Sequence, residues 1–216
     1  MFVLIIDYGS GNIKSVHNSV KKTLQNLNKS SDLKVSSNIS DIRKADKIIL
    51  PGVGSFDQCM DRIRNINGLV KTLSEQIIVK RKPFLGICVG MQILANYGYE
   101  NQKTKGLSWI DGDVKSLKNS ISMSKGLKIP HMGWNNLSIN KKNILFDNIT
   151  HKDQFYFVHS YFFDIKHNKN IICNTKYGID IPAIVNEDNI FGFQFHPEKS
   201  GISGLKILNN WLKLSI

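Results

Sequence analysis

The 216-residue chain has no long hydrophobic run and few cysteines. No apolar stretch approaches the roughly 20 residues of a membrane-spanning helix. The short run Phe2–Ile6 stops at Asp7 without the basic lead-in or cleavage site of a signal peptide. The three cysteines, Cys59, Cys88 and Cys173, are odd in number and lack the spacing of a metal site. We therefore expect a protein of a reducing, cytoplasmic compartment that binds no metal.

Acidic residues are also scarce: 17 Asp and Glu stand against 29 Lys and Arg, which gives a formal net charge of +12. Such a charge can indicate nucleic-acid binding. The basic residues are scattered, however, and form neither a helix stripe nor an alternation with aromatic residues. The charge therefore does not predict a nucleic-acid partner, although a basic surface for an acidic protein or a phosphorylated substrate stays open.

The chain shows no linker, internal repeat or low-complexity tract, so we expect one domain over residues 1–216. The all-apolar run Phe2–Ile6 predicts a buried parallel strand, and strand–helix units repeat through the first hundred residues. The second half reads as strands joined by polar turns, until a helix is predicted over 202–214. We expect a mixed α/β fold with a largely parallel central sheet, helices on both faces and a strand-rich second half.

A short segment around Cys88 carries a sign of chemistry. The apolar run 84–87 predicts a buried strand, and apolar residues at helical spacing predict a helix over 91–97. Between them, Gly86, Cys88 and Gly90 form G-x-C-x-G, the cysteine counterpart of a nucleophile elbow. The glycines are needed because the turn crowds the backbone, and the start of the following helix favours the thiolate. A buried packing cysteine is the alternative.

A nucleophilic cysteine needs a base and a third group that orients the base. Among the six histidines, His196 follows the apolar run 191–195 and precedes Glu198 by two residues. Extended residues at i and i+2 point the same way, so Glu198 can accept from one imidazole nitrogen while the other faces the sulfur. We therefore predict a Cys88–His196–Glu198 triad. A histidine with an acidic neighbour by chance is the alternative.

The glycine-rich segment 51–54 follows a predicted strand, Lys47 to Leu50. Two glycines and a proline directly after a strand predict a backbone that another group can approach closely. A plain connection between a strand and a helix is the alternative, and its sequence would be the same. In a doubly wound sheet, functional sites gather beyond the C-terminal ends of the strands. We therefore expect Gly52 and Cys88 to lie near each other.

The elbow and the His196-Pro197-Glu198 segment resemble the class I glutamine amidotransferases. Further segments resemble glutaminase subunits of that family, in order along nearly the whole chain: 7–12, 51–54, 130–135, 156–161 and 192–200. The 130–135 segment is the most specific, because many amidotransferases share the triad. The resemblance implies a flavodoxin-like fold, glutamine as substrate and no metal or organic cofactor.

The resemblance also implies residue roles. Cys88 would attack the glutamine δ-carbonyl and form a thioester. His196 would pass the proton to the leaving ammonia and later activate water, with Glu198 orienting it. The backbone N–H of Val89, just after the nucleophile, and the Gly52–Val53 peptide would form the oxyanion hole.

The same resemblance implies a glutamine pocket and a partner surface. Gln92 would contact the α-substituents of glutamine, with a pocket wall made by His159, Ser160 and Tyr161. Four residues would face a synthase subunit: Asn12, Trp134, Asn135 and Lys199.

The implied partner is a (β/α)8-barrel cyclase subunit of histidine biosynthesis, joined to this chain as a heterodimer. The cyclase would receive ammonia through its interior and add it to a phosphoribulosyl-formimino aminoimidazole carboxamide ribonucleotide. The resemblance also implies that the isolated glutaminase is nearly inactive, because in this family the partner reorients the peptide that corresponds to Gly52–Val53. A duplicated subunit that supplies ammonia for amidino modification of a surface sugar would carry the same triad. A catalytically idle binding module would not need it.

Overall fold

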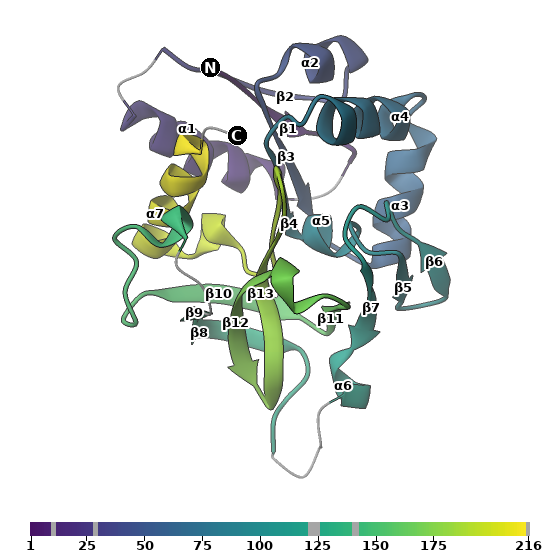
Figure 1. Ribbon diagram of the computed structural model, residues 1–216, viewed down its shortest axis with the longest axis vertical. Coiled ribbons are helices and arrows are strands. Elements are labelled where there is room, and N and C mark those ends of the chain that lie inside the picture. Colours follow the sequence, from purple (N-terminus) through teal and green to yellow (C-terminus); the bar gives the residue numbers. More distant parts are fainter. Residues whose placement is uncertain (10–11, 28–29, 121–125, 140–142, 215–216) are drawn as a thin grey trace.

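The computed structural model describes residues 1–9, 12–27, 30–120, 126–139 and 143–214. Within these ranges, eight strands form a mixed central sheet in the order β2-β1-β3-β4-β14-β13-β12-β9 (Figure 1). The half from β2 to β14 is parallel, and the half from β14 to β9 is antiparallel. The strands are β1 Phe2–Ile6, β2 Asp32–Ser36, β3 Lys47–Gly52, β4 Phe84–Cys88, β9 Ser138–Ile139, β12 Ile171–Tyr177, β13 Ile179–Glu187 and β14 Ile190–Phe193.

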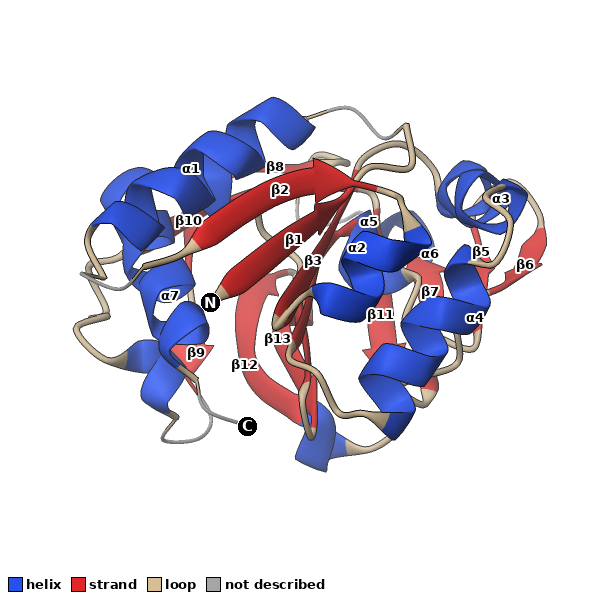
Figure 2. Cartoon of the chain, turned by 90° about the horizontal axis from the view of Figure 1, so that it is seen from above, coloured by secondary structure: helices blue, strands red, loops and turns tan. Residues whose placement is uncertain are grey.

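Helices cover both faces of this sheet, as the alternating pattern predicts (Figure 2). Helices α1 and α7 pack together on one face, and α2, α3 and α4 lie on the other. The apolar stripe of α1 buries Val16, Val20 and Leu24 against the sheet. The longer helical segments are α1 Ile13–Gln25, α2 Ile39–Lys44, α3 Phe56–Asn65, α4 Leu69–Ser74 with a π-helical continuation Glu75–Val79, and α7 Gly201–Lys213.

The second half is rich in strands, as expected, but several of them lie outside the central sheet. A two-stranded sheet pairs β8 (His131–Asn136) with β10 (Gln154–His159). A four-stranded sheet has the order β11-β7-β5-β6. Its strands are β5 Tyr97–Tyr99, β6 Lys103–Lys105, β7 Gly112–Ser116 and β11 Tyr161–Ile165. The remaining short helices are α5 Val89–Gln92, α6 Leu117–Ser120 and the 3-10 turns Ile144–Phe146, Asn168–Asn170 and Pro197–Lys199.

The helix predicted over 91–97 is wrong in extent, because α5 ends at Gln92 and Tyr97 begins β5. The backbone carbonyls that a longer helix would use are taken by a distant loop. The carbonyl of Ile93 accepts from Leu107 N, and that of Leu94 accepts from Trp109 N. The helical spacing of these apolar residues therefore reflects burial in a tight turn.

The strands β1, β3, β4 and β14 of the parallel half are buried on both faces, which explains their apolar runs, whereas the edge strand β2 is partly exposed. In β1, the side chains from Val3 to Ile6 are all fully buried. One large apolar cluster includes residues from both halves of the chain. No helix within the described ranges is long and apolar enough to span a membrane.

Candidate active site

Cys88 stands at a sharp turn between β4 and α5. It is the last residue of β4, and α5 begins at the next residue, Val89. The backbone of Cys88 has φ 54° and ψ −110°, which a residue with a side chain rarely adopts. Such strain is typical of a nucleophile held at the end of a strand.

Three glycines make this turn possible by removing side chains where backbones touch. A Cβ on Gly86 would lie 2.3 Å from Gly90 O, and one on Gly90 would lie 2.0 Å from Leu50 O. A Cβ on Gly52 would lie 2.4 Å from Gly90 N. The backbone of α5 therefore rests directly on the end of β3, which fixes the glycine-rich turn beside Cys88.

His196 reaches Cys88 because β14 runs parallel to β4 in the central sheet. Its Nδ1 lies 2.7 Å from Glu198 Oε1, and both side chains are almost fully buried. The prediction that these residues lie on extended backbone is wrong, since Pro197–Lys199 is a 3-10 turn. The turn, rather than strand alternation, brings the carboxylate to the imidazole.

The surroundings of His196 favour its protonated form. Burial alone would lower its pKa, but the charge and hydrogen bond of Cys88, followed by those of Glu198, raise the pKa to about 10. Asn12 Nδ2 donates a hydrogen bond to Glu198 Oε1, the same oxygen that His196 contacts. An imidazolium beside the sulfur can stabilise a thiolate and give a proton to a leaving group. Helix α5 has only four residues, so its dipole adds little to this effect.

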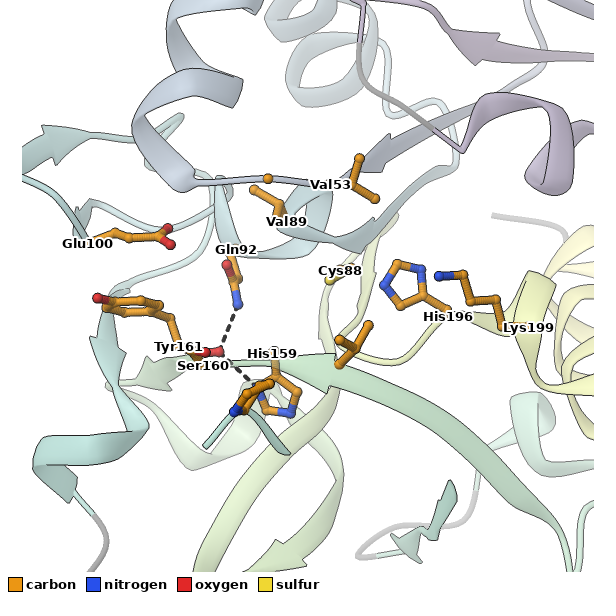
Figure 3. Close-up of a pocket in the computed structure, with 13 residues that line it drawn as sticks. Val53, Cys88, Val89, Gln92, Glu100, His159, Ser160, Tyr161, His196 and Lys199 are labelled. Atoms are coloured by element: carbon orange, nitrogen blue, oxygen red, sulfur yellow. Dashed lines mark hydrogen bonds between the residues drawn. The ribbon is translucent and has the colours of Figure 1, made fainter. Parts of the chain in front are cut away.

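A pocket of about 400 Å³ opens above Cys88. Figure 3 shows Cys88 and His196 toward one end of it, Glu100 and Tyr161 toward the other, and Gln92 between them. This volume falls in the range of small-molecule sites. The predicted residues among its lining are Val53, Cys88, Val89, Gln92, His159, Ser160, Tyr161, His196 and Lys199.

Gln92 is held in place by the protein through its amide nitrogen. Nε2 lies 2.9 Å from Tyr161 O and 3.1 Å from Gln194 Oε1. The Gln194 side chain is fully buried, and its Nε2 lies 3.9 Å from Cys88 Sγ. Gln194 has no place among the sequence predictions. A polar residue inside the apolar run 191–195 was the signal that could have found it.

Glu100 is a pocket residue that sequence reasoning also missed. Its carboxylate lines the pocket and accepts a hydrogen bond from Phe56 N at 2.8 Å. Burial raises its pKa above the ordinary value. No local pattern marked it, because the carboxylate reaches the pocket only through the turn that replaces the helix predicted over 91–97.

Behind the pocket wall, two neutral histidines form a chain of hydrogen bonds. His159 Nδ1 lies 2.9 Å from Tyr161 O, which can only accept, so Nδ1 carries the hydrogen. His159 Nε2 then accepts from His131 Nδ1 at 3.0 Å, and His131 Nε2 accepts from Asn135 Nδ2 at 3.2 Å. Burial lowers the pKa of His131 to about 4 and that of His159 to about 3, and repulsion between the two rings when both are protonated lowers the pKa of His159 further. The chain connects β8 with the pocket.

The residues expected at a partner surface separate into two groups. Trp134 is 62% exposed and meets the ring of Tyr156 edge-on at 5.1 Å, while Lys199 Nζ lies 5.6 Å from the same ring. These three side chains form a surface patch next to the pocket, since Lys199 also lines it. Asn12 and Asn135 instead contact Glu198 and His131. Both asparagines therefore bond to buried groups behind this surface.

The sequence matches the family model described as glutamine amidotransferase class-I over residues 4–214. The chain therefore belongs to the class-I glutamine amidotransferase family. Solved structures share its fold at low sequence identity. A putative GMP synthase protein from Thermoplasma acidophilum is 16% identical, with a TM-score of 0.67 over 98% of this chain and 92% of that one. A glutamine amidotransferase from Thermotoga maritima is 18% identical, with a TM-score of 0.62 over 92% of this chain and 76% of that one.

Several relatives with higher sequence identity are named as HisH subunits. The imidazole glycerol phosphate synthase subunit HisH of Pelagibacter ubique is 47% identical over 99% of this chain and its own full length. The HisH subunit of Brucella suis is 39% identical over 99% of both chains. Subunit HisH 1 of Campylobacter jejuni is 41% identical over 98% of this chain and its own full length. The similarity thus spans the pocket and both smaller sheets.

Proposed function

We propose that this chain is the glutaminase subunit of an imidazole glycerol phosphate synthase. The observation that carries the chemistry is the pocket in which Cys88 meets the buried His196–Glu198 pair. Near full-length similarity to HisH subunits supports the choice of synthase. The whole chain acts as one domain, in the cytoplasm, where its unpaired cysteines stay reduced.

The reaction follows from the positions of three groups. Cys88 Sγ attacks the δ-carbonyl carbon of glutamine, and the backbone N–H groups of Val89 and Val53 stabilise the resulting oxyanion. Protonated His196 gives its proton to the leaving nitrogen, so ammonia departs and a thioester with Cys88 remains. His196 then takes a proton from water, which hydrolyses the thioester to glutamate.

The far end of the pocket suits the α-substituents of the substrate. Glu100 lies there (Figure 3), and its carboxylate can pair with the α-ammonium group of glutamine. Gln92 and His159 both bond to the Tyr161 carbonyl and so hold that wall in place. This orientation directs the side-chain amide of glutamine toward Cys88.

The partner is a (β/α)8-barrel cyclase that receives the ammonia and uses it on a phosphorylated aminoimidazole carboxamide ribonucleotide. The patch of Trp134, Tyr156 and Lys199 supports a docking site here, since it combines an exposed aromatic ring with a cation. Trp134 and Lys199 are the partner-surface residues that the family resemblance implies.

The test is glutamate release from glutamine by the purified chain mixed with the cyclase of the same organism and its nucleotide. We expect activity from the complex and none from the complex that carries Cys88→Ala. Retained activity in Cys88→Ala would refute the mechanism. A wild-type complex that releases no glutamate would refute the proposed function.

A further inference from the structure

The Gly52–Val53 peptide lies between two backbone carbonyls that are each held by a buried side chain. The hydroxyl of Tyr8 donates to Pro51 O at 2.8 Å. On the other side of the peptide, Cys59 Sγ lies 3.4 Å from Val53 O. Tyr8 is 4% exposed and Cys59 is 1% exposed, and they come from different elements. One follows β1 and the other belongs to α3.

The two side chains also contact each other. Tyr8 Oη lies 3.6 Å from Cys59 Sγ, so the hydroxyl and the thiol form one connected group. Burial raises the pKa of Cys59 to about 11, so at neutral pH its sulfur keeps the hydrogen that it needs as a donor. Neither side chain is among those that line the pocket. Both side chains hold backbone carbonyls of the turn beside Cys88.

We propose that Tyr8 and Cys59 form a clamp that holds the two peptide planes flanking the Gly52–Val53 peptide, and thereby fixes the axis about which the oxyanion donor, the N–H of Val53, turns. This inference rests on the proposed function, which gives that peptide its role. Tyr8 and Cys59 are positioning residues, since they do not touch the substrate.

The geometry of the peptide bond explains how the clamp works. Each peptide unit is planar, so holding its carbonyl oxygen holds the whole plane. Tyr8 holds the plane that precedes Gly52, and Cys59 holds the plane that follows Val53. The peptide between them can then turn only about ψ of Gly52 and φ of Val53. The close approach of Gly52 to Gly90 keeps the turn from sliding along the elbow.

The test uses Cys59→Ala and Tyr8→Phe, each assayed as the complex with the cyclase. We expect kcat to fall about tenfold in either variant while the KM for glutamine stays within about twofold, since a misaligned oxyanion donor weakens the transition state and not substrate binding. The double variant should lose less than the product of the two single effects, because both residues act on one peptide. Cys59→Ser keeps a donor and should retain more kcat than Cys59→Ala. Unchanged kcat in Cys59→Ala, or no benefit of serine over alanine, would overturn the clamp.

Cys173→Ala is the matched control. Cys173 is fully buried in β12 and does not belong to the pocket lining, so its removal should lower the melting temperature without changing kcat. If kcat falls as much in Cys173→Ala as in Cys59→Ala, the loss of activity in Cys59→Ala comes from lost stability. That result would overturn the clamp.

Amide hydrogen exchange separates this inference from the proposed function. In the chain alone, Cys59→Ala and Tyr8→Phe should speed exchange at the amides of Val53 and Gly54, and Cys173→Ala should not. If the wild-type complex releases no glutamate, the proposed function fails and the exchange measurement still tests the clamp. Unchanged exchange in both clamp variants overturns the clamp even when the wild-type complex is active.

Discussion

His196 holds a proton between two acidic groups in a nearly dry environment. Burial opposes the charge of the imidazolium, yet Cys88 and Glu198 together raise its pKa to about 10. The proposed reaction needs this proton, because the nitrogen would otherwise have to leave as the amide ion NH2−, a very poor leaving group. In the proposed mechanism, the release of ammonia therefore depends on whether the imidazole of His196 is protonated.

Replacing Glu198 by glutamine tests whether the charge of Glu198 raises the pKa of His196. The amide keeps the shape of the carboxylate but removes its charge, so the pKa of His196 should fall. We expect kcat of the complex to drop by about a hundredfold or more, as when the orienting carboxylate of another triad is removed. The alkaline limb of the pH profile should move to lower pH, because the imidazolium is then lost earlier. An unchanged limb would contradict this role of Glu198.

Glu100 provides a contrasting change at the other end of the pocket. Glu100→Gln keeps an acceptor for Phe56 N and removes the charge that attracts the α-ammonium group. A charge-assisted hydrogen bond contributes about 2 kcal/mol, so the KM for glutamine should rise about thirtyfold with kcat little changed. Steady-state kinetics of the complex measure both constants. A fall in kcat at constant KM would place Glu100 outside the substrate site.

The contrast between His196 and Glu100 also shows what a sequence can reveal about a site. His196 and Glu198 are two residues apart, so their pairing was visible before the fold was known. Tertiary packing alone brings Glu100 to the pocket and Gln194 to the side chain of Gln92. No periodicity or spacing marks Glu100, and Gln194 is marked only as a polar residue inside an apolar run, so the sequence predicts the His196–Glu198 pair better than the residues around it.

At the level of elements, the pair β8 and β10 carries the two neutral histidines. His131 stacks between the rings of Phe157 and Tyr177, at 4.8 and 4.1 Å between centroids. It faces His159 as a hydrogen-bond partner at 3.0 Å. A proton added to His159 would fall on Nε2 and displace the hydrogen bond from His131, and one added to His131 would fall on Nε2 and displace the hydrogen bond from Asn135.

The stability of the chain should consequently depend on pH. The pKa of His131 is about 4 in the folded chain against 6.5 as its ordinary value. The unfolded chain therefore binds more protons between these values, and stability falls as pH drops from about 6.5 toward 4. His131→Phe keeps the stacking, so we expect it to lose about 2 kcal/mol less between pH 7 and pH 5 than the wild type. Urea unfolding at both pH values measures the difference, and equal losses would contradict it.

The element level also shows why one helix was predicted too long. Apolar residues at helical spacing continue past Gln92, but their carbonyls are used by residues 107–110. Whether a buried apolar segment stays helical depends on partners that lie elsewhere in the chain. The amphipathic helix α1 was predictable, because its single apolar stripe meets a sheet and its other face meets water.

For the whole molecule, the return of β14 to the side of β4 is the decisive step of the fold. It places His196 from the second half next to Cys88 from the first half. The alternation of strands and helices predicts a parallel sheet, but the order of its strands leaves no local pattern in the sequence. The class of fold could therefore be predicted, whereas the pairing of distant strands could not.

The activity of the isolated chain tests the proposed role as a subunit. If the cyclase reorients the Gly52–Val53 peptide, the chain alone lacks one oxyanion donor, and such a loss costs about a hundredfold or more in kcat. We therefore expect glutamate release by the isolated chain to be about a hundredfold slower than by the complex. Assays with increasing amounts of cyclase measure this ratio. Full activity without the cyclase would rule out activation by the partner.

The contacts among Gly52, Gly86 and Gly90 have a consequence for how this gene can change. Every missense mutation of a glycine codon introduces a Cβ, and at these three positions that atom would lie 2.0 to 2.4 Å from backbone. The ends of β3 and β4 would then separate, and the glycine-rich turn 51–54 would move away from the sulfur of Cys88. These three positions therefore allow no neutral amino-acid replacement while selection keeps the reaction.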